Sequence, residues 1–113
     1  MPHLIIEFAR DLADDTQVSA LLEAVHQAAA ASGLFQLSHI RSRAIPLSFY
    51  RAGEDNAGFI HAQLRIHAGR DAAQKQALSS AVLAAIRGQG WPVRSITVEV
   101  VEMDRASYSK YSV

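Results

Sequence analysis

The sequence predicts an α/β (α+β) fold in which two tandem βαβ units form one four-stranded sheet with both helices on one face. An extended segment, a capped helical segment and a second extended segment follow one another within residues 2–50, and the same order recurs within residues 58–103. A βαβ unit keeps its strands parallel through a right-handed crossover, so both helices are expected on the same side of the sheet. The 113 residues suffice for one hydrophobic core but not for two. We therefore expect a single domain over residues 1–113.

The first unit begins with PHLIIEFA at residues 2–9, whose alternation and β-branched side chains predict a strand. The acidic and threonine residues of DLADDTQ, at 11–17, are suited to cap the helix that follows. Apolar side chains then recur on one helical face, at Val18, Leu21, Leu22, Val25, Ala28 and Ala29. Gly33 is placed to end this helix. Residues 35–50 are predicted to be extended, with a break at Pro46, before the turn-rich RAGEDNAG at 51–58.

The second unit starts with GFIHAQLRIH at residues 58–67, which alternates and predicts a strand with one apolar side. Asp71 and Gln74 follow at the spacing of a capping box and open a helix. The apolar face of that helix is formed by Ala77, Leu78, Ala81, Val82, Ala85 and Ile86. Gly88 and Gly90 are placed to end it, and SITVEVVEM at 95–103 predicts the closing strand.

The composition argues against several classes of function. The 11 basic and 11 acidic side chains give a formal net charge of zero, so we expect neither a nucleic acid nor a membrane as partner. No segment approaches the roughly 18 apolar residues of a membrane span, and no signal-peptide pattern is present, so a cytoplasmic location is expected. Cysteine is absent, which leaves no thiolate nucleophile or thiolate metal site. His61 and His67 do not have a metal-ligand spacing on a strand, so no metal is expected.

The face of the sheet opposite the helices is left uncovered by this arrangement. Its predicted side chains include small and apolar ones, which are stabilised when another surface covers them. A protein without net charge also lacks repulsion between its copies. We therefore expect other copies of the chain to cover this face.

Three stretches of the chain resemble one enzyme family. MPH at the N-terminus, GLFQLSHIRSR at 33–43 and GFIHAQLRIHAGRDAAQKQAL at 58–78 are together similar to the 5-carboxymethyl-2-hydroxymuconate isomerases of the tautomerase superfamily. VEVVEMDRASYSK at 98–110 is similar to the end of that family, and IHAGRDAAQK resembles the turn of the small 4-oxalocrotonate tautomerases. The resemblance implies a tautomerase-like domain, a homotrimer, and isomerisation of 5-carboxymethyl-2-hydroxymuconate to its 2-oxo-3-ene isomer in homoprotocatechuate degradation, without a cofactor.

The resemblance also gives a role to Pro2, which would otherwise be a proline tolerated at the first position of a strand. Removal of Met1 leaves Pro2 with a secondary amine. An apolar pocket and nearby positive charge both disfavour the protonated amine, and they lower its pKa toward the range in which a general base works best. The resemblance implies that this nitrogen carries one proton between the enol oxygen of the substrate and a vinylogous carbon.

Arginines are the second feature that the resemblance makes functional. It implies that Arg41 is catalytic or binds a carboxylate, and that Arg43, Arg70, Phe35 and His3 contact the substrate. Arg41 and Arg43 lie on one face of an extended segment, and Arg70 precedes a helix N-terminus, where an anion is favoured. An arginine holds a carboxylate through two hydrogen bonds. A small polycarboxylate enol or 2-oxo acid is therefore the expected substrate.

Other interpretations stay open. Arg43 and Arg70 fit a surface or interface role as well, Phe35 fits the core, and His3 fits a subunit contact. The enzyme can instead act on another unsaturated 2-oxo acid or on a phenylpyruvate-like enol, and two βαβ units can also form a non-enzymatic, oligomerising module that binds small molecules. Two stretches depart from the family: residues 44–57 match it poorly, and Arg105 stands where it has proline, a change expected to affect only the tail.

Overall fold

Two βαβ units make up the fold, as the computed structural model shows for residues 1–113. In chain order the elements are β1 (His3–Ala9), the short 3-10 helix η1 (Arg10–Leu12), α1 (Asp15–Ala31), the 3-10 helix η2 (Leu37–His39), β2 (Arg41–Leu47), β3 (Phe59–His67), α2 (Ala72–Arg87) and β4 (Ser95–Met103). The strands form one sheet in the order β2-β1-β3-β4. Pairing is parallel within each unit and antiparallel between β1 and β3, where the units meet. The predicted fold class is confirmed.

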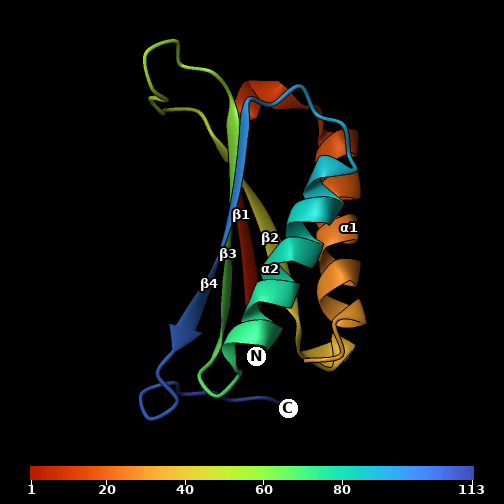
Figure 1. Cartoon of the computed structure of the whole chain (residues 1–113), viewed down its shortest axis with the longest axis vertical. Coiled ribbons are helices and arrows are strands. Elements are labelled where there is room, and N and C mark those ends of the chain that lie inside the picture. The colour runs from red at the N-terminus through yellow and green to blue at the C-terminus, as the bar shows by residue number, and fades with distance from the viewer.

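The two helices lie side by side on one face of the sheet and leave the other face free of helices (Figure 1). Alternate residues of β1 and β3 point toward the helices and are buried, including Leu4, Ile6 and Leu64. The helices contribute buried positions four residues apart, Leu21, Val25 and Ala29 on α1 and Leu78, Val82 and Ile86 on α2. The predicted apolar faces thus pack against one another across a single core layer.

Both helices begin with a capping box. Asp71 accepts a hydrogen bond from the backbone nitrogen of Gln74 at 2.7 Å, and the Gln74 side chain accepts one from the Asp71 nitrogen. Asp14 and Gln17 form an equivalent capping box at the start of α1, with a 2.8 Å bond from the Gln17 nitrogen to Asp14. The acidic cap of α1 was expected from the sequence, whereas the second half of the box, Gln17, was not identified there.

Pro46 does not break the extended segment, contrary to the sequence-based expectation. It pairs with Phe8 inside β2. The strand β2 lies at the edge of the sheet, and proline is compatible with an edge strand because one side of that strand needs no backbone partner. The sequence also placed Pro2 inside the first strand, but β1 begins at His3, and the carbonyl of Pro2 accepts a 3.0 Å bond from the Arg41 nitrogen.

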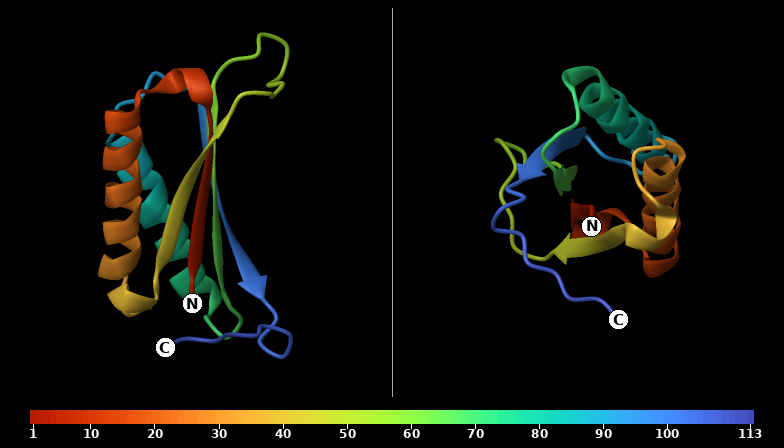
Figure 2. Two further views of the ribbon diagram at one scale, coloured as in Figure 1. Left: turned by 180° about the vertical axis from the view of Figure 1, so that it is seen from behind. Right: turned by 90° about the horizontal axis from the view of Figure 1, so that it is seen from below.

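The uncovered face of the sheet carries a mixture of charged and apolar side chains. The register sets His3 between Arg41 and Arg65, and Ile5 between Arg43 and Gln63. The N-terminus and the C-terminal segment both lie at one end of this sheet (Figure 2). Neither helix combines the length and the apolar composition that crossing a bilayer requires.

Candidate active site

Pro2 lines a small cavity of about 60 Å³ together with four side chains from distant parts of the chain. Phe35 comes from the connection between α1 and β2, His67 ends β3, Arg70 directly precedes the capping residue of α2, and Arg105 follows β4. Pro2 itself is buried. The antiparallel contact between the two units brings these segments together at one end of the sheet, because the start of β1 lies beside the end of β3.

Arg70 is fixed at this cavity by two contacts. Its Nη2 donates a 2.6 Å hydrogen bond to the carbonyl of Leu34, and its guanidinium carbon lies 5.8 Å from the centre of the Phe35 ring. A guanidinium above an aromatic face is attracted by the ring quadrupole. Arg70 and Phe35 therefore hold each other in place beside Pro2, while the remaining guanidinium donors of Arg70 are available to a carboxylate.

Arg105 is the second cation of the cavity. Its Nε donates a 2.8 Å hydrogen bond to the carbonyl of Ala68, which ties the segment after β4 to the turn before α2. The sequence drew attention to this position only as a departure from the family pattern, with an effect expected on the tail alone. The structure shows that the tail folds back, so the change also brings a guanidinium to the wall of the Pro2 cavity.

The electrostatic environment of the N-terminus disfavours a positive charge. The pKa of the Met1 ammonium is lowered, first by burial and then by the positive charges of Lys110, Arg41 and Arg105. Desolvation and like charge both favour the neutral amine. Pro2 follows Met1 directly, and two of the side chains that share its cavity, Arg70 and Arg105, are cationic. Burial and this positive charge would favour an uncharged amine at Pro2 if Met1 is removed.

Arg41 lies near this end of the chain but does not line the Pro2 cavity. Its Nη1 donates hydrogen bonds to the carbonyls of Ser38 at 2.9 Å and Ile40 at 3.2 Å. The Arg41 side chain is thus folded onto the turn that precedes β2. Its positive charge is still close enough to lower the pKa of the Met1 amine.

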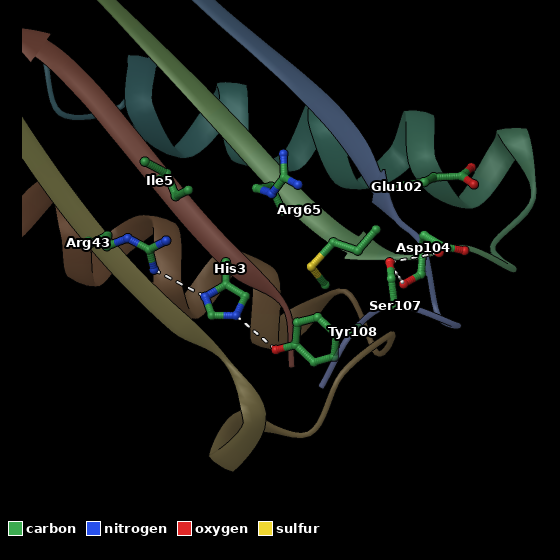
Figure 3. Close-up of a pocket in the computed structure, with 9 residues that line it drawn as sticks. His3, Ile5, Arg43, Arg65, Glu102, Asp104, Ser107 and Tyr108 are labelled. Atoms are coloured by element: carbon green, nitrogen blue, oxygen red, sulfur yellow. Dashed lines mark hydrogen bonds between the residues drawn. The ribbon is translucent and has the colours of Figure 1, made fainter. Parts of the chain in front are cut away.

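His3 and Arg43 line a different and wider recess, of about 550 Å³, on the uncovered face of the sheet (Figure 3). Nη1 of Arg43 donates to Nδ1 of His3 at 3.2 Å, and Nε2 of His3 lies 3.1 Å from the hydroxyl of Tyr108. Because arginine has no acceptor, His3 must accept at Nδ1 and carry its proton on Nε2. Burial and the Arg43 charge lower the pKa of His3, in agreement with a neutral ring.

Three of the six side chains that the sequence pointed to therefore meet in one cavity: Pro2, Phe35 and Arg70. Arg41 is adjacent, and His3 and Arg43 belong to the neighbouring recess. Sequence reasoning missed His67 and Arg105. His67 had a signal, since it ends an alternating strand just before the Gly-Arg turn, but it was considered only as a metal ligand.

Comparison with known proteins matches almost the whole chain to one family. The family model for 5-carboxymethyl-2-hydroxymuconate isomerase matches residues 2–110. The curated 5-carboxymethyl-2-hydroxymuconate Delta-isomerase of Escherichia coli is 31% identical over 78 residues, which are 67% of this chain and 62% of that relative. The aligned part thus spans less than two thirds of the E. coli protein.

Solved structures show the same fold. The crystal structure of a 5-carboxymethyl-2-hydroxymuconate isomerase from Deinococcus radiodurans R1 is similar with a TM-score of 0.84 and 25% identity, over 99% of this chain and 90% of that chain. The Q0 fused 4-OT wild-type symmetric trimer is similar with a TM-score of 0.82 and 20% identity, over 96% of this chain and 90% of that chain.

Proposed function

Since the chain belongs to the 5-carboxymethyl-2-hydroxymuconate isomerase family, we propose that it is a tautomerase that interconverts 5-carboxymethyl-2-hydroxymuconate and its 2-oxo-3-ene isomer. Pro2 is the proposed catalytic base, acting through its amine after Met1 is removed. The observation that carries this proposal is the burial of Pro2 at the wall of a cavity that also holds Arg70 and Arg105.

The proposed step is a transfer of one proton. Neutral Pro2 takes the proton of the enol hydroxyl, the electron pair moves through the conjugated system, and the resulting ammonium returns the proton to a vinylogous carbon. Atoms and electrons balance without a co-reactant, so the proposal includes no cofactor. A general base works best when its pKa lies near the operating pH, and burial together with the positive charges around the N-terminus moves the pKa in that direction.

Arg70 and Arg105, which line the same cavity as Pro2, are suited to bind carboxylates of the substrate. Both have one nitrogen engaged with a backbone carbonyl, which fixes the guanidinium before the substrate arrives. Preorganised cationic donors stabilise the negative charge that develops in a dienolate and do not have to reorganise during the reaction. Arg41 has the same proposed role through its charge, and His3 and Arg43 would meet a carboxylate that extends into the wider recess.

The cavity of about 60 Å³ is smaller than a polycarboxylate substrate needs, whereas the neighbouring recess has about 550 Å³. We propose that the complete site forms in a homotrimer, in which other copies cover the free face of the sheet. The structural similarity to a trimeric fused 4-OT supports this assembly, as does the absence of net charge.

The test is an ultraviolet assay of ketonisation on three versions of the protein: the processed chain, Pro2→Ala, and a chain that keeps an uncleaved residue before Pro2. Intact mass establishes which versions have lost Met1. We expect kcat to fall by about 10²- to 10⁴-fold in Pro2→Ala and in the blocked chain. Wild-type turnover by the blocked chain would exclude the amine as base.

The substrate panel separates the remaining alternatives. The carboxymethyl-hydroxymuconate enol is compared with enols of other unsaturated 2-oxo acids and with a phenylpyruvate-like enol that has one carboxylate. Higher kcat/KM on the polycarboxylate supports the proposal, since each additional carboxylate meets an arginine. Higher kcat/KM on the single carboxylate would assign the alternative activity, and turnover of none would favour a binding module.

A further inference from the structure

His67 has a polar atom that the fold leaves without a partner. Its Nδ1 is shielded from solvent and makes no hydrogen bond within the chain. The great majority of buried polar atoms in native proteins are hydrogen-bonded, and an exception requires an explanation such as a functional role. The same imidazole is one of the five side chains around the Pro2 cavity.

The ring of His67 is held in a defined position. The Tyr108 ring packs edge-on against it, with 4.8 Å between the ring centres, and the Tyr108 hydroxyl is in turn bonded to His3. Burial lowers the pKa of His67, and the charges of the N-terminal amine, Arg105 and Lys110 lower it further, so its surroundings favour the neutral ring. A neutral imidazole has one donor and one acceptor nitrogen, so Nδ1 can donate a hydrogen bond without being charged.

Strand register places His67 next to the residue that processing of the chain would remove. Residues of β1 and β3 pair as His3 with Arg65 and Leu4 with Leu64. Continuing that register by two residues sets Met1 opposite His67, and the N-terminal amine is among the charges that act on the His67 ring. Removal of Met1 therefore frees space beside His67 and exposes the Pro2 nitrogen to the same space.

We propose that His67 is a further catalytic residue, whose Nδ1–H donates a hydrogen bond to the oxygen at C2 of the substrate. This inference rests on the proposed function. When Pro2 removes the enol proton, negative charge develops on that oxygen, and a fixed donor in a shielded cavity stabilises it. His67 keeps its own proton throughout, so the proton balance of the reaction is unchanged.

Three substitutions of His67 distinguish the contributions of Nδ1, of Nε2 and of the packing of the ring to activity. His67→Asn keeps an amide donor near the position of Nδ1, His67→Gln keeps one near Nε2, and His67→Phe keeps the ring that packs against Tyr108. We expect kcat to fall about 100-fold in His67→Gln and His67→Phe, and by less than about tenfold in His67→Asn, with smaller changes in KM. Thermal unfolding and light scattering verify that each variant is folded and assembled like the wild type.

The inference is overturned if the Gln and Phe variants retain wild-type kcat, or if all three variants lose activity equally while remaining folded. In either case the proposed function stands as long as the wild-type protein turns over the enol. If a variant does not fold, the inference is tested in the wild-type protein, by a binding measurement that does not need turnover.

In the wild-type protein, the ¹⁵N resonance of His67 Nδ1 is followed while 2-oxoadipate or adipate is added, two dicarboxylates that differ at C2 only by the oxygen. A shift with 2-oxoadipate and none with adipate is expected. Equal responses to both, or no response to either, would contradict a hydrogen bond to the C2 oxygen. A selective shift in a protein that turns over none of the enols would refute the proposed function while retaining His67 as a 2-oxo acid ligand.

Discussion

The hydroxyl of Tyr108 lies 3.1 Å from Nε2 of His3, which joins two residues 105 positions apart in the chain. This contact fastens the segment after β4 over the start of β1. The same segment carries Arg105 to the Pro2 cavity. The C-terminal residues thus form part of the candidate site, although nothing in their sequence pattern indicates a secondary structure.

Tyr108→Phe is predicted to loosen this segment. The substitution removes one hydrogen bond, worth about 1 kcal/mol, so the undocked population is expected to rise about fivefold. Cleavage of the native protein by trypsin at Lys110 measures that population. Tyr50→Phe is the matched control, because the Tyr50 hydroxyl bonds to Asp11, which is outside the tail. Equal cleavage rates in Tyr108→Phe and the wild type would show that the contact does not retain the segment.

Asp71→Ala is predicted to destabilise the protein by about 1 kcal/mol, because it removes the side-chain acceptor that caps α2. Asp14→Ala removes the corresponding acceptor from α1 and is expected to have a similar effect. Chemical denaturation at a fixed protomer concentration measures both changes. Since Asp71 adjoins Arg70, Asp71→Ala alone is also expected to raise KM. An equal rise in KM for Asp14→Ala would indicate a general loss of structure.

Stability is predicted to fall as the pH is lowered through the range below 6.5, the ordinary pKa of histidine. Both His3 and His67 have a lowered pKa in the folded protein, so the unfolded chain binds more protons than the folded one in this range. Positive groups face both rings: Arg43, Arg41, Arg65 and the N-terminal amine face His3, and the amine, Arg105 and Lys110 face His67.

Thermal unfolding between about pH 7.5 and pH 5.5 measures this dependence. His3→Gln is expected to reduce the loss of stability at the acidic end, because it removes one of the two groups. His39→Asn is the control, since His39 is exposed and its ring makes no hydrogen bond. A pH dependence that is the same in His3→Gln and the wild type would contradict the assignment to His3.

Ile5→Arg is predicted to disrupt the proposed assembly. Ile5 lies on the uncovered face of the sheet between Arg43 and Gln63, so an added guanidinium there would place charge in a contact between copies. Ala20→Arg adds the same charge on an exposed helix position. Light scattering is expected to show a lower mass for Ile5→Arg only, with unchanged circular dichroism. An unchanged mass would show that this face is not the contact.

The fold was predictable because its signals are local. Alternation predicted the segments that form β1 and β3, and the Asp71–Gln74 spacing located the start of α2. The edge position of β2, which accommodates Pro46, depends on strand order and was not visible in the segment itself.

The site was less predictable, since it depends on contacts between distant segments. Pro2, Phe35 and Arg70 could be identified because they occur in recognisable stretches. Arg105 and His67 join them only through the return of the C-terminal segment and the antiparallel register of β1 with β3. No periodic pattern in the sequence indicates either of these long-range contacts.

The pKa of the Pro2 nitrogen tests the central claim most directly. In protein labelled with ¹⁵N-proline, the N-terminal nitrogen resonance is followed through a pH titration. The account predicts a titrating secondary amine with a pKa below that of an ordinary N-terminal proline. In Arg105→Ala, which removes one of the nearby positive charges, this pKa is expected to be higher than in the wild type. A non-titrating Pro2 nitrogen, still bonded to Met1, or an amine with an ordinary pKa would contradict the account.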